Sequence, residues 1–376
     1  MAASFHDRFV ASDYRLLRER GIRTVREGLR WHLIEPSPSR YDFSSVELIL
    51  RAARETGTEV IWDLWHYGWP DGLDIFSAEF VRRFAAFARR AGQLLSEDAE
   101  APFVCPVNEI SFFAFAGGEA GFFNPFAHWR GDEMKRQLVR ASVAAIGALR
   151  EVNPRIRLCH IDPLINVQPE RPELAAEARL HHLSQYEACD MILGRQAPEL
   201  GGQEDFIDLI GLNYYIHNQW THGGGSIVPS DSRYRHIREL LAENFARYGK
   251  PLFIAETGIE DETRPAWLRY ICNEVFAAIA EGVPVEGVCL YPVLNHPGWD
   301  DDRHCHNGLI DYAGDEAGRQ VYEPLAKEIA RQREILAQLR GGAPFLDRRE
   351  TDVSALDWAA HVMQERTDES RTAKER

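Results

Sequence analysis

The stretch SSVELILRAARETGTEVIWDLWH (residues 44–66) contains a helical segment, a glycine and a β-rich run, in that order. Ser44 and Glu47 have the spacing of a capping box, in which two side chains satisfy backbone N–H groups at the start of a helix. Gly57 suits the left-handed conformation that follows the last turn of a helix. We therefore predict a helix from Ser44 to Glu55 and a strand in the run TEVIWDLWH after Gly57.

The same order recurs along the chain, with Gly21, Gly249 and Gly282 each lying between a helical segment and a β-rich run. The runs expected as strands are 22–31, 58–66, 102–109, 155–162, 206–215, 250–258 and 283–294. The further helices are expected at 77–95, 132–152, 172–196, 235–247, 264–281 and 316–339. Strands that alternate with helices predict parallel β/α units with right-handed crossovers.

This alternation predicts an α/β fold, a (β/α)8 TIM barrel whose first strand is short or missing from this chain. An open, doubly wound sheet would also accept seven strands, but it usually carries a glycine-rich phosphate loop after its first strand. Neither GxGxxG nor GxxxxGK[ST] occurs in the sequence. We expect a single barrel domain over 1–340 and a C-terminal extension over 341–376, with a disordered polar end.

Composition excludes several classes of partner. Acidic residues outnumber basic ones by 58 to 43, which gives a formal charge of −15. This charge argues against nucleic acid or an anionic membrane surface as a partner, and no run of 18 apolar residues predicts a membrane span. The six cysteines form no CxxC pair. A reducing compartment, and hence a cytoplasmic location, is expected.

Two glutamates lie at or near the carboxyl ends of predicted strands, where a β/α barrel places its chemistry. Glu109 ends the run PFVCPVNE, and Glu256 lies in PLFIAETG. On the fourth and seventh strands of a barrel, these carboxylates would face each other across its mouth. Glycoside hydrolysis needs two such carboxylates, one that donates a proton and one that attacks or activates water. Asn108 beside Glu109 can bind a sugar hydroxyl, and Arg26 and Tyr215 would keep Glu256 ionised.

Aromatic residues lie just past the same strand ends, and their rings stack well on the apolar faces of sugars. Half or more of them are expected only to pack loops against the barrel. They are Trp65, Tyr67, Trp69, Phe112, Phe113, Trp129, Trp220 and Trp299.

Six motifs resemble those of clan A glycoside hydrolases, and in particular the family 1 β-glucosidases. The chain resembles a divergent member over residues 10–335. The motifs are TVREGLRW (24–31), LWHYGWP (64–70), PVNEI (106–110), DLIGLNYY (208–215), FIAETG (253–258) and YPVLNHPGW (291–299).

The resemblance implies a retaining β-glycosidase that acts on a small-molecule or oligosaccharide β-glycoside. Glu109 maps to the acid/base and Glu256 to the nucleophile. The residues that map to substrate binding are Arg26, His66, Asn108, Asn213, Tyr215, Tyr291 and Trp299. The family has a glutamate where this chain has Gly298, so the identity of the sugar stays open.

Two alternatives to the glycosidase remain. One is a barrel that binds sugar but has lost turnover. The other is a metal-dependent sugar isomerase or epimerase that uses Glu109, His160, Asp162 and Glu256 as ligands.

A further pattern, DDRHCHNG (301–308), brings His304, Cys305 and His306 close together. No third or fourth ligand has obvious spacing, so a solvated loop is the preferred interpretation. No metal site and no cofactor are expected.

Overall fold

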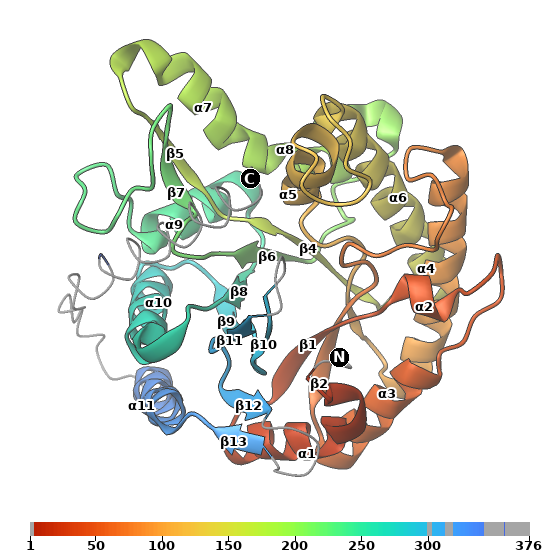
Figure 1. The fold of residues 1–376 in the computed structure, drawn as a ribbon, viewed down its shortest axis with the longest axis horizontal. Coiled ribbons are helices and arrows are strands. Elements are labelled where there is room, and N and C mark those ends of the chain that lie inside the picture. The colour runs from red at the N-terminus through yellow and green to blue at the C-terminus, as the bar shows by residue number, and fades with distance from the viewer. Residues whose placement is uncertain (1–3, 299–302, 313–318, 342–356, 358–376) are drawn as a thin grey trace. The chain divides into compact units, whose positions relative to one another are not determined.

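Figure 1 shows the computed structural model, which describes residues 4–298, 303–312, 319–341 and 357. The chain forms two compact units. The N-terminal unit contains residues 7–163 and 184–212, and the C-terminal unit contains residues 1–6, 164–183 and 213–376. The C-terminal extension predicted over 341–376 lies almost entirely outside the described residues.

The N-terminal unit is built on five strands in the order β1-β2-β3-β4-β6, and β6 ends at the unit boundary. β1 pairs with β2, β2 with β3 and β3 with β4, all in parallel. The strands are β1 (Thr24–Gly28), β2 (Glu59–Asp63), β3 (Phe103–Cys105), β4 (Arg157–Pro163) and β6 (Leu209–Asn213). The principal helices are α1 (His6–Glu19), α2 (Trp31–Ile34), α3 (Ser44–Thr56), α4 (Ala78–Asp98), α5 (Ile110–Phe113), α6 (Gly131–Val152) and α8 (Glu187–Ile192).

Helix α4 covers part of the core of this unit because its apolar residues recur at helical spacing. Phe80, Phe84 and Phe87 are buried and surround Trp31, with ring centroids 5.2 to 5.6 Å from that of the tryptophan. The helix begins after Ser77, whose hydroxyl accepts the N–H of Phe80. α4 runs beside α6 (Figure 1), and Gly92 permits the close approach, since a Cβ there would lie 2.9 Å from Leu149.

The C-terminal unit contains the parallel pair β8 (Leu252–Thr257) and β9 (Val285–Leu290). Its smaller strand pairs are β5 (Asn166–Pro169) with β7 (Gln219–His222), β10 (His296–Pro297) with β11 (His304–Cys305), and β12 (Ile310–Tyr312) with β13 (Arg319–Val321). The longer helices are α7 (Ala175–Leu183), α9 (Ile237–Tyr248), α10 (Arg264–Ala280) and α11 (Glu323–Arg340). None of the described helices is long and apolar enough to span a bilayer.

The predicted order of helix, glycine and strand is confirmed. Gly21, Gly57, Gly249 and Gly282 all have positive φ, and all seven predicted strand runs contain a strand. In the described part of the chain, α1 precedes the first strand, β1.

Three local predictions are wrong. In the helix predicted over 316–339, residues Arg319–Val321 form β13 instead, and α11 begins only at Glu323. Helix α3 begins after Phe43 without a side-chain cap from Ser44, and the Asp42 carboxylate accepts the Ser44 N–H instead. The helix predicted over 172–196 is broken into α7 and α8, which belong to different units.

Candidate active site

Glu109 lies at a sharp turn between β3 and α5. Its backbone N–H donates to the carbonyl of Ile161 on β4 at 2.9 Å. Its φ of 48° is in the left-handed region, which a residue with a side chain adopts at a cost. The Tyr67 hydroxyl donates a short hydrogen bond to Oε2 of Glu109. Both backbone and side chain of this glutamate are therefore held in place.

The turn after Glu109 is fixed by Asp162 on β4. The Asp162 carboxylate accepts the backbone N–H of Ser111 at 3.0 Å and its hydroxyl at 2.7 Å. Burial raises the pKa of Asp162 to about 7; the hydrogen bonds from Ser111 oppose the rise, and the negative charge of Glu109 adds to it. Burial also lowers the pKa of His160 to about 4, so that the imidazole is neutral at pH 7.

A buried ion pair lies beside Asn108. The Arg26 guanidinium forms a bidentate ion pair with the Asp63 carboxylate, with Nε 2.9 Å from Oδ1 and a terminal nitrogen 2.7 Å from Oδ2. Both side chains are less than 10% exposed. Burial opposes ionisation of Asp63, but Arg26 and His66 hold the pKa of its carboxyl below the usual value. Arg26 also donates to Oδ1 of Asn108. The amide of Asn108 lies 3.4 Å from His66 Nε2 and 3.4 Å from the Tyr67 hydroxyl.

The N-terminal unit therefore brings together four of the predicted site residues, Arg26, His66, Asn108 and Glu109. The sequence did not single out Asp63 as a site residue. Tyr67 was counted only as one aromatic among several. The position of Tyr67, next to His66 in the motif LWHYGWP, was the available signal.

In the C-terminal unit, Glu256 lies near the end of β8 and is 6% exposed. The Tyr215 hydroxyl donates to its Oε2 at 2.8 Å. The backbone N–H of Tyr214 donates to the carbonyl of Glu256 at 2.9 Å. Tyr215 therefore lies beside Glu256, as expected from the sequence.

Two further predicted site residues, Asn213 and Tyr291, are described in the C-terminal unit. Asn213 is buried, and Tyr291 follows β9, with its N–H donating to the Thr257 carbonyl at 2.9 Å. The backbone of Tyr291 passes so close to Gly258 that a Cβ there would lie 2.0 Å from the Tyr291 oxygen. Trp299 lies outside the described residues.

The aromatic residues divide into buried and exposed groups. Trp65, Trp69 and Phe113 are buried and contact one another, with centroids of Trp65 and Phe113 at 4.9 Å, so they serve as loop packing. Tyr67, which holds Glu109, lies about 6 Å by ring centroid from Phe112 and from Phe123. Five aromatic residues between Glu109 and α6 are exposed: Phe112, Phe115, Phe122, Phe126 and Trp129.

Two curated proteins are similar to the chain in sequence, and no protein-family model matches it. The chain is 22% identical over 364 residues to the chloroplastic β-glucosidase-like protein SFR2 of Oryza sativa subsp. japonica, covering 83% of this chain and 53% of that protein. It is 25% identical over 312 residues to a β-galactosidase of Sulfolobus acidocaldarius, covering 72% of this chain and 62% of that protein. The chain thus spans between half and two thirds of the length of these relatives.

Solved structures show the same fold over most of the chain. A hyperthermophilic β-glucosidase mutant superposes with a TM-score of 0.74 at 18% identity, covering 87% of this chain and 88% of the other. The family 1 β-glucosidase of Thermotoga maritima, in complex with isofagomine lactam, gives a TM-score of 0.73 at 18% identity, covering 88% and 87%. The predicted resemblance and the predicted fold class are both confirmed: the chain has the TIM-barrel fold of the family 1 β-glucosidases.

Proposed function

We propose that the protein is a retaining β-glycosidase in which Glu109 and Glu256 act as a pair. The observation that carries the proposal is that each glutamate follows or ends a parallel strand and is held by a tyrosine hydroxyl, Tyr67 for Glu109 and Tyr215 for Glu256. A carboxylate with fixed orientation is what nucleophilic attack and directed proton transfer need. The TIM-barrel fold shared with β-glucosidases supports the same function.

The proposed reaction has two steps. In the first, Glu256 attacks the anomeric carbon, the glycosidic bond breaks, and Glu109 gives its proton to the departing oxygen. In the second, Glu109 takes a proton from water, the water oxygen attacks the same carbon, and the ester to Glu256 is broken. Each step inverts the anomeric configuration, so the sugar is released with its original configuration. The proposal requires the two carboxyl groups to be about 5–5.5 Å apart around the substrate.

In this proposal Arg26, His66, Asn108, Asn213, Tyr215, Tyr291 and Trp299 bind the substrate. The network of Arg26, Asp63, His66 and Asn108 supports this role for its members, because buried groups bonded to one another present their remaining donors in fixed directions.

The aglycone that we propose is aromatic or otherwise apolar. Glu109 faces the leaving group in this mechanism, and Tyr67 on Glu109 contacts the rings of Phe112 and Phe123. A cluster of rings beside the acid/base favours an apolar leaving group over a charged one.

The six cysteines are free thiols, which supports a reducing compartment such as the cytoplasm as the place where the protein works.

The decisive experiment measures turnover of a panel of nitrophenyl β-glycosides by the wild type, Glu109→Gln and Glu256→Gln. Each variant should lose at least about 10³-fold in kcat, since each removes one of the two groups on which the chemistry depends. Glu133→Gln, which alters an exposed glutamate paired with Arg130, is the matched control and should keep full activity.

NMR of the first-formed sugar anomer should show the β configuration. An α-anomer as first product would contradict retention. Tight glycan binding without product release would favour the non-catalytic barrel. Interconversion of free sugars that is lost on dialysis against EDTA would favour the metal-dependent isomerase.

A further inference from the structure

The pattern His304-Cys305-His306 places two imidazoles on one side of the chain. Side chains alternate along extended backbone, so residues 304 and 306 share a face and Cys305 takes the other. The structure follows this alternation: Cys305 is 3% exposed and its thiol donates to the Arg303 carbonyl, whereas both histidines are partly exposed. The thiol therefore belongs to the packing under the strand, and the two rings belong to the surface.

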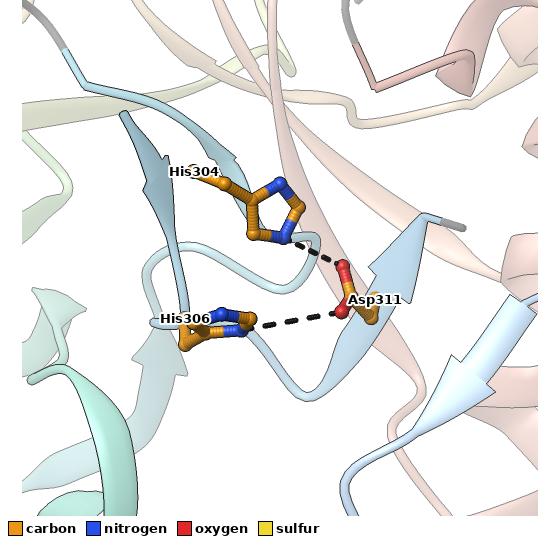
Figure 2. Close-up of side chains that lie close together, drawn as sticks. All are labelled: His304, His306 and Asp311. Carbon is orange, nitrogen blue, oxygen red and sulfur yellow. Dashed lines mark hydrogen bonds and ion pairs between the residues drawn. The ribbon is translucent and has the colours of Figure 1, made fainter. Parts of the chain in front are cut away.

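A third group joins the two imidazoles from a different strand. Figure 2 shows both rings directed at the carboxylate of Asp311 on β12. His304 Nε2 is 2.9 Å from Asp311 Oδ1, and His306 Nδ1 is 4.0 Å from Asp311 Oδ2. The three ligand atoms that these residues offer lie within 4.8 Å of one another.

The backbone that carries these groups is tied down on both sides. In β11, His304 pairs with Pro297 of β10, and in β12, Asp311 pairs with Gln320 of β13. The loop between the strands is fixed at Gly308, whose N–H donates to the Asn295 side chain at 2.7 Å. The backbone that carries the three side chains is thus ordered before any ligand binds, which lowers the conformational entropy that the protein loses on binding.

The Arg264 guanidinium lies close enough to Asp311 to interact with its charge, but the hydrogen bonds described for it go to other groups. The Arg264 guanidinium donates to the backbone carbonyls of Asp261 and Gly308 and lies over the ring of Tyr322. The Arg303 guanidinium forms a bidentate ion pair with the Glu260 carboxylate. The charge of Asp311 consequently faces two imidazoles, and a divalent cation between them would have a negative ligand and two neutral nitrogen ligands.

We propose that His304, His306 and Asp311 bind a divalent transition-metal ion, with Zn²⁺ as the preferred occupant. Imidazole nitrogen and carboxylate oxygen are zinc ligands, and three protein ligands with one water complete a tetrahedral site. With metal–ligand bonds of about 2.0–2.2 Å, neighbouring ligand atoms lie about 3.4 Å apart in such a site. His304 Nε2 and His306 Nδ1 lie 2.9 and 4.0 Å from the two carboxylate oxygens of Asp311, and one ligand atom from each of the three residues lies within 4.8 Å of the others. Side-chain rotations would therefore bring three ligand atoms onto one ion.

Every ligand and supporting contact of this site belongs to the C-terminal unit, and none is a residue proposed to act on the sugar. The ion would join β11 to β12 across the loop that carries Gly308. Because a folded site binds metal better than the unfolded chain does, zinc should stabilise the fold.

The test uses the full chain, freed of metal by chelation and then titrated with ZnCl2 and, separately, CoCl2. Isothermal titration should show one equivalent of Zn²⁺ per chain, and Co²⁺ should give the visible absorption of a low-symmetry site with nitrogen and oxygen ligands. His306→Gln and Asp311→Asn should each weaken Zn²⁺ binding by about tenfold or more, since each removes one of three ligands. The rise in Tm that zinc causes in the wild type should vanish in both variants.

His222→Gln is the matched control, because His222 also pairs with a carboxylate, that of Glu177 at 3.0 Å, in the same unit. This variant should bind zinc as the wild type does. Circular dichroism of the metal-free variants separates loss of a ligand from loss of folding. Zinc affinity that survives in both His306→Gln and Asp311→Asn, or the absence of a stoichiometric site in the wild type, would overturn the proposal. The measurement needs no activity, so its result is independent of the proposed glycosidase function.

Discussion

The carboxylate of Asp162, on β4, accepts both the backbone N–H and the hydroxyl of Ser111, two residues beyond Glu109. This pair of bonds anchors the first turn after the proposed acid/base to the neighbouring strand. The carboxyl performs this function in a buried setting that raises its pKa to about 7, so its protonation state changes near neutral pH.

Asp162 makes the stability of the protein depend on pH. The pKa of Asp162 in the folded state, about 7, exceeds the ordinary value of 3.8, so the folded state binds more protons than the unfolded state between these values. The contribution of Asp162 to the free energy of unfolding is therefore complete below about pH 4 and is lost as the pH rises through about 7. Asp162→Asn removes this dependence, and its stability relative to the wild type should rise between pH 4.5 and 7.5. Urea unfolding at several pH values measures the difference; a constant offset would contradict the assigned shift.

Tyr215→Phe should reduce kcat on nitrophenyl glycosides by about 10- to 100-fold, the equivalent of one hydrogen bond to a charged group, about 1.5–3 kcal/mol. KM should change less than kcat, because the hydroxyl, besides its proposed part in substrate binding, donates to Glu256 at 2.8 Å and would orient that carboxylate. Tyr214→Phe is the control, since this hydroxyl bonds to Gln219 and Tyr234 instead. It should lower Tm and spare kcat. Equal kinetic losses in the two variants would argue against a specific role for Tyr215.

Tyr67→Phe removes the hydrogen bond to Glu109. If Glu109 protonates the leaving oxygen, the loss should be largest for substrates whose leaving group needs a proton. We expect kcat/KM to fall more for an alkyl glycoside than for a dinitrophenyl glycoside, whose leaving group departs without help. A uniform loss across leaving groups would assign Tyr67 to substrate binding.

Gly258→Ala should destabilise the C-terminal unit by about 1–3 kcal/mol or more, because the new Cβ would lie 2.0 Å from the Tyr291 carbonyl oxygen and the backbone must shift. The shift would separate β8, which carries Glu256, from the end of β9, so activity should fall as well. Gly287→Ala, on β9, is the control, since a Cβ there meets nothing within 4 Å. Differential scanning calorimetry distinguishes the two; similar Tm values for both variants would show that the backbone at Gly258 relaxes freely.

Local signals explain why much of the fold was predictable. A glycine with positive φ after a helix and an apolar β-rich run are encoded by neighbouring residues, and Gly57 followed by β2 is one example. The predicted capping box of Ser44 and Glu47 is absent, and the Ser44 N–H donates to the Asp42 carboxylate instead. The prediction of one helix over 172–196 was wrong because the helical pattern of the sequence does not reveal that α7 and α8 belong to different units.

Site residues could be predicted from the sequence only where they belong to a recognisable motif. Glu109, Glu256 and Tyr215 follow from motifs, whereas the pairing of Arg26 with Asp63 depends on the register of β1 against β2. Asp311 could not be joined to His304 from spacing, because the contact arises where β11 and β12 fold toward each other. The opposition of Glu109 and Glu256 stays a prediction, which the kinetic experiments address.

At position 109, the residue that best suits the left-handed backbone differs from the residue that the proposed chemistry needs. Glycine and asparagine adopt its φ of 48° more readily than glutamate does. In a library screened for heat resistance alone, substitutions to these residues should accumulate at position 109, and the survivors would be robust but inert. Retention of glutamate under combined screening for heat resistance and turnover would then reveal what the acid group contributes.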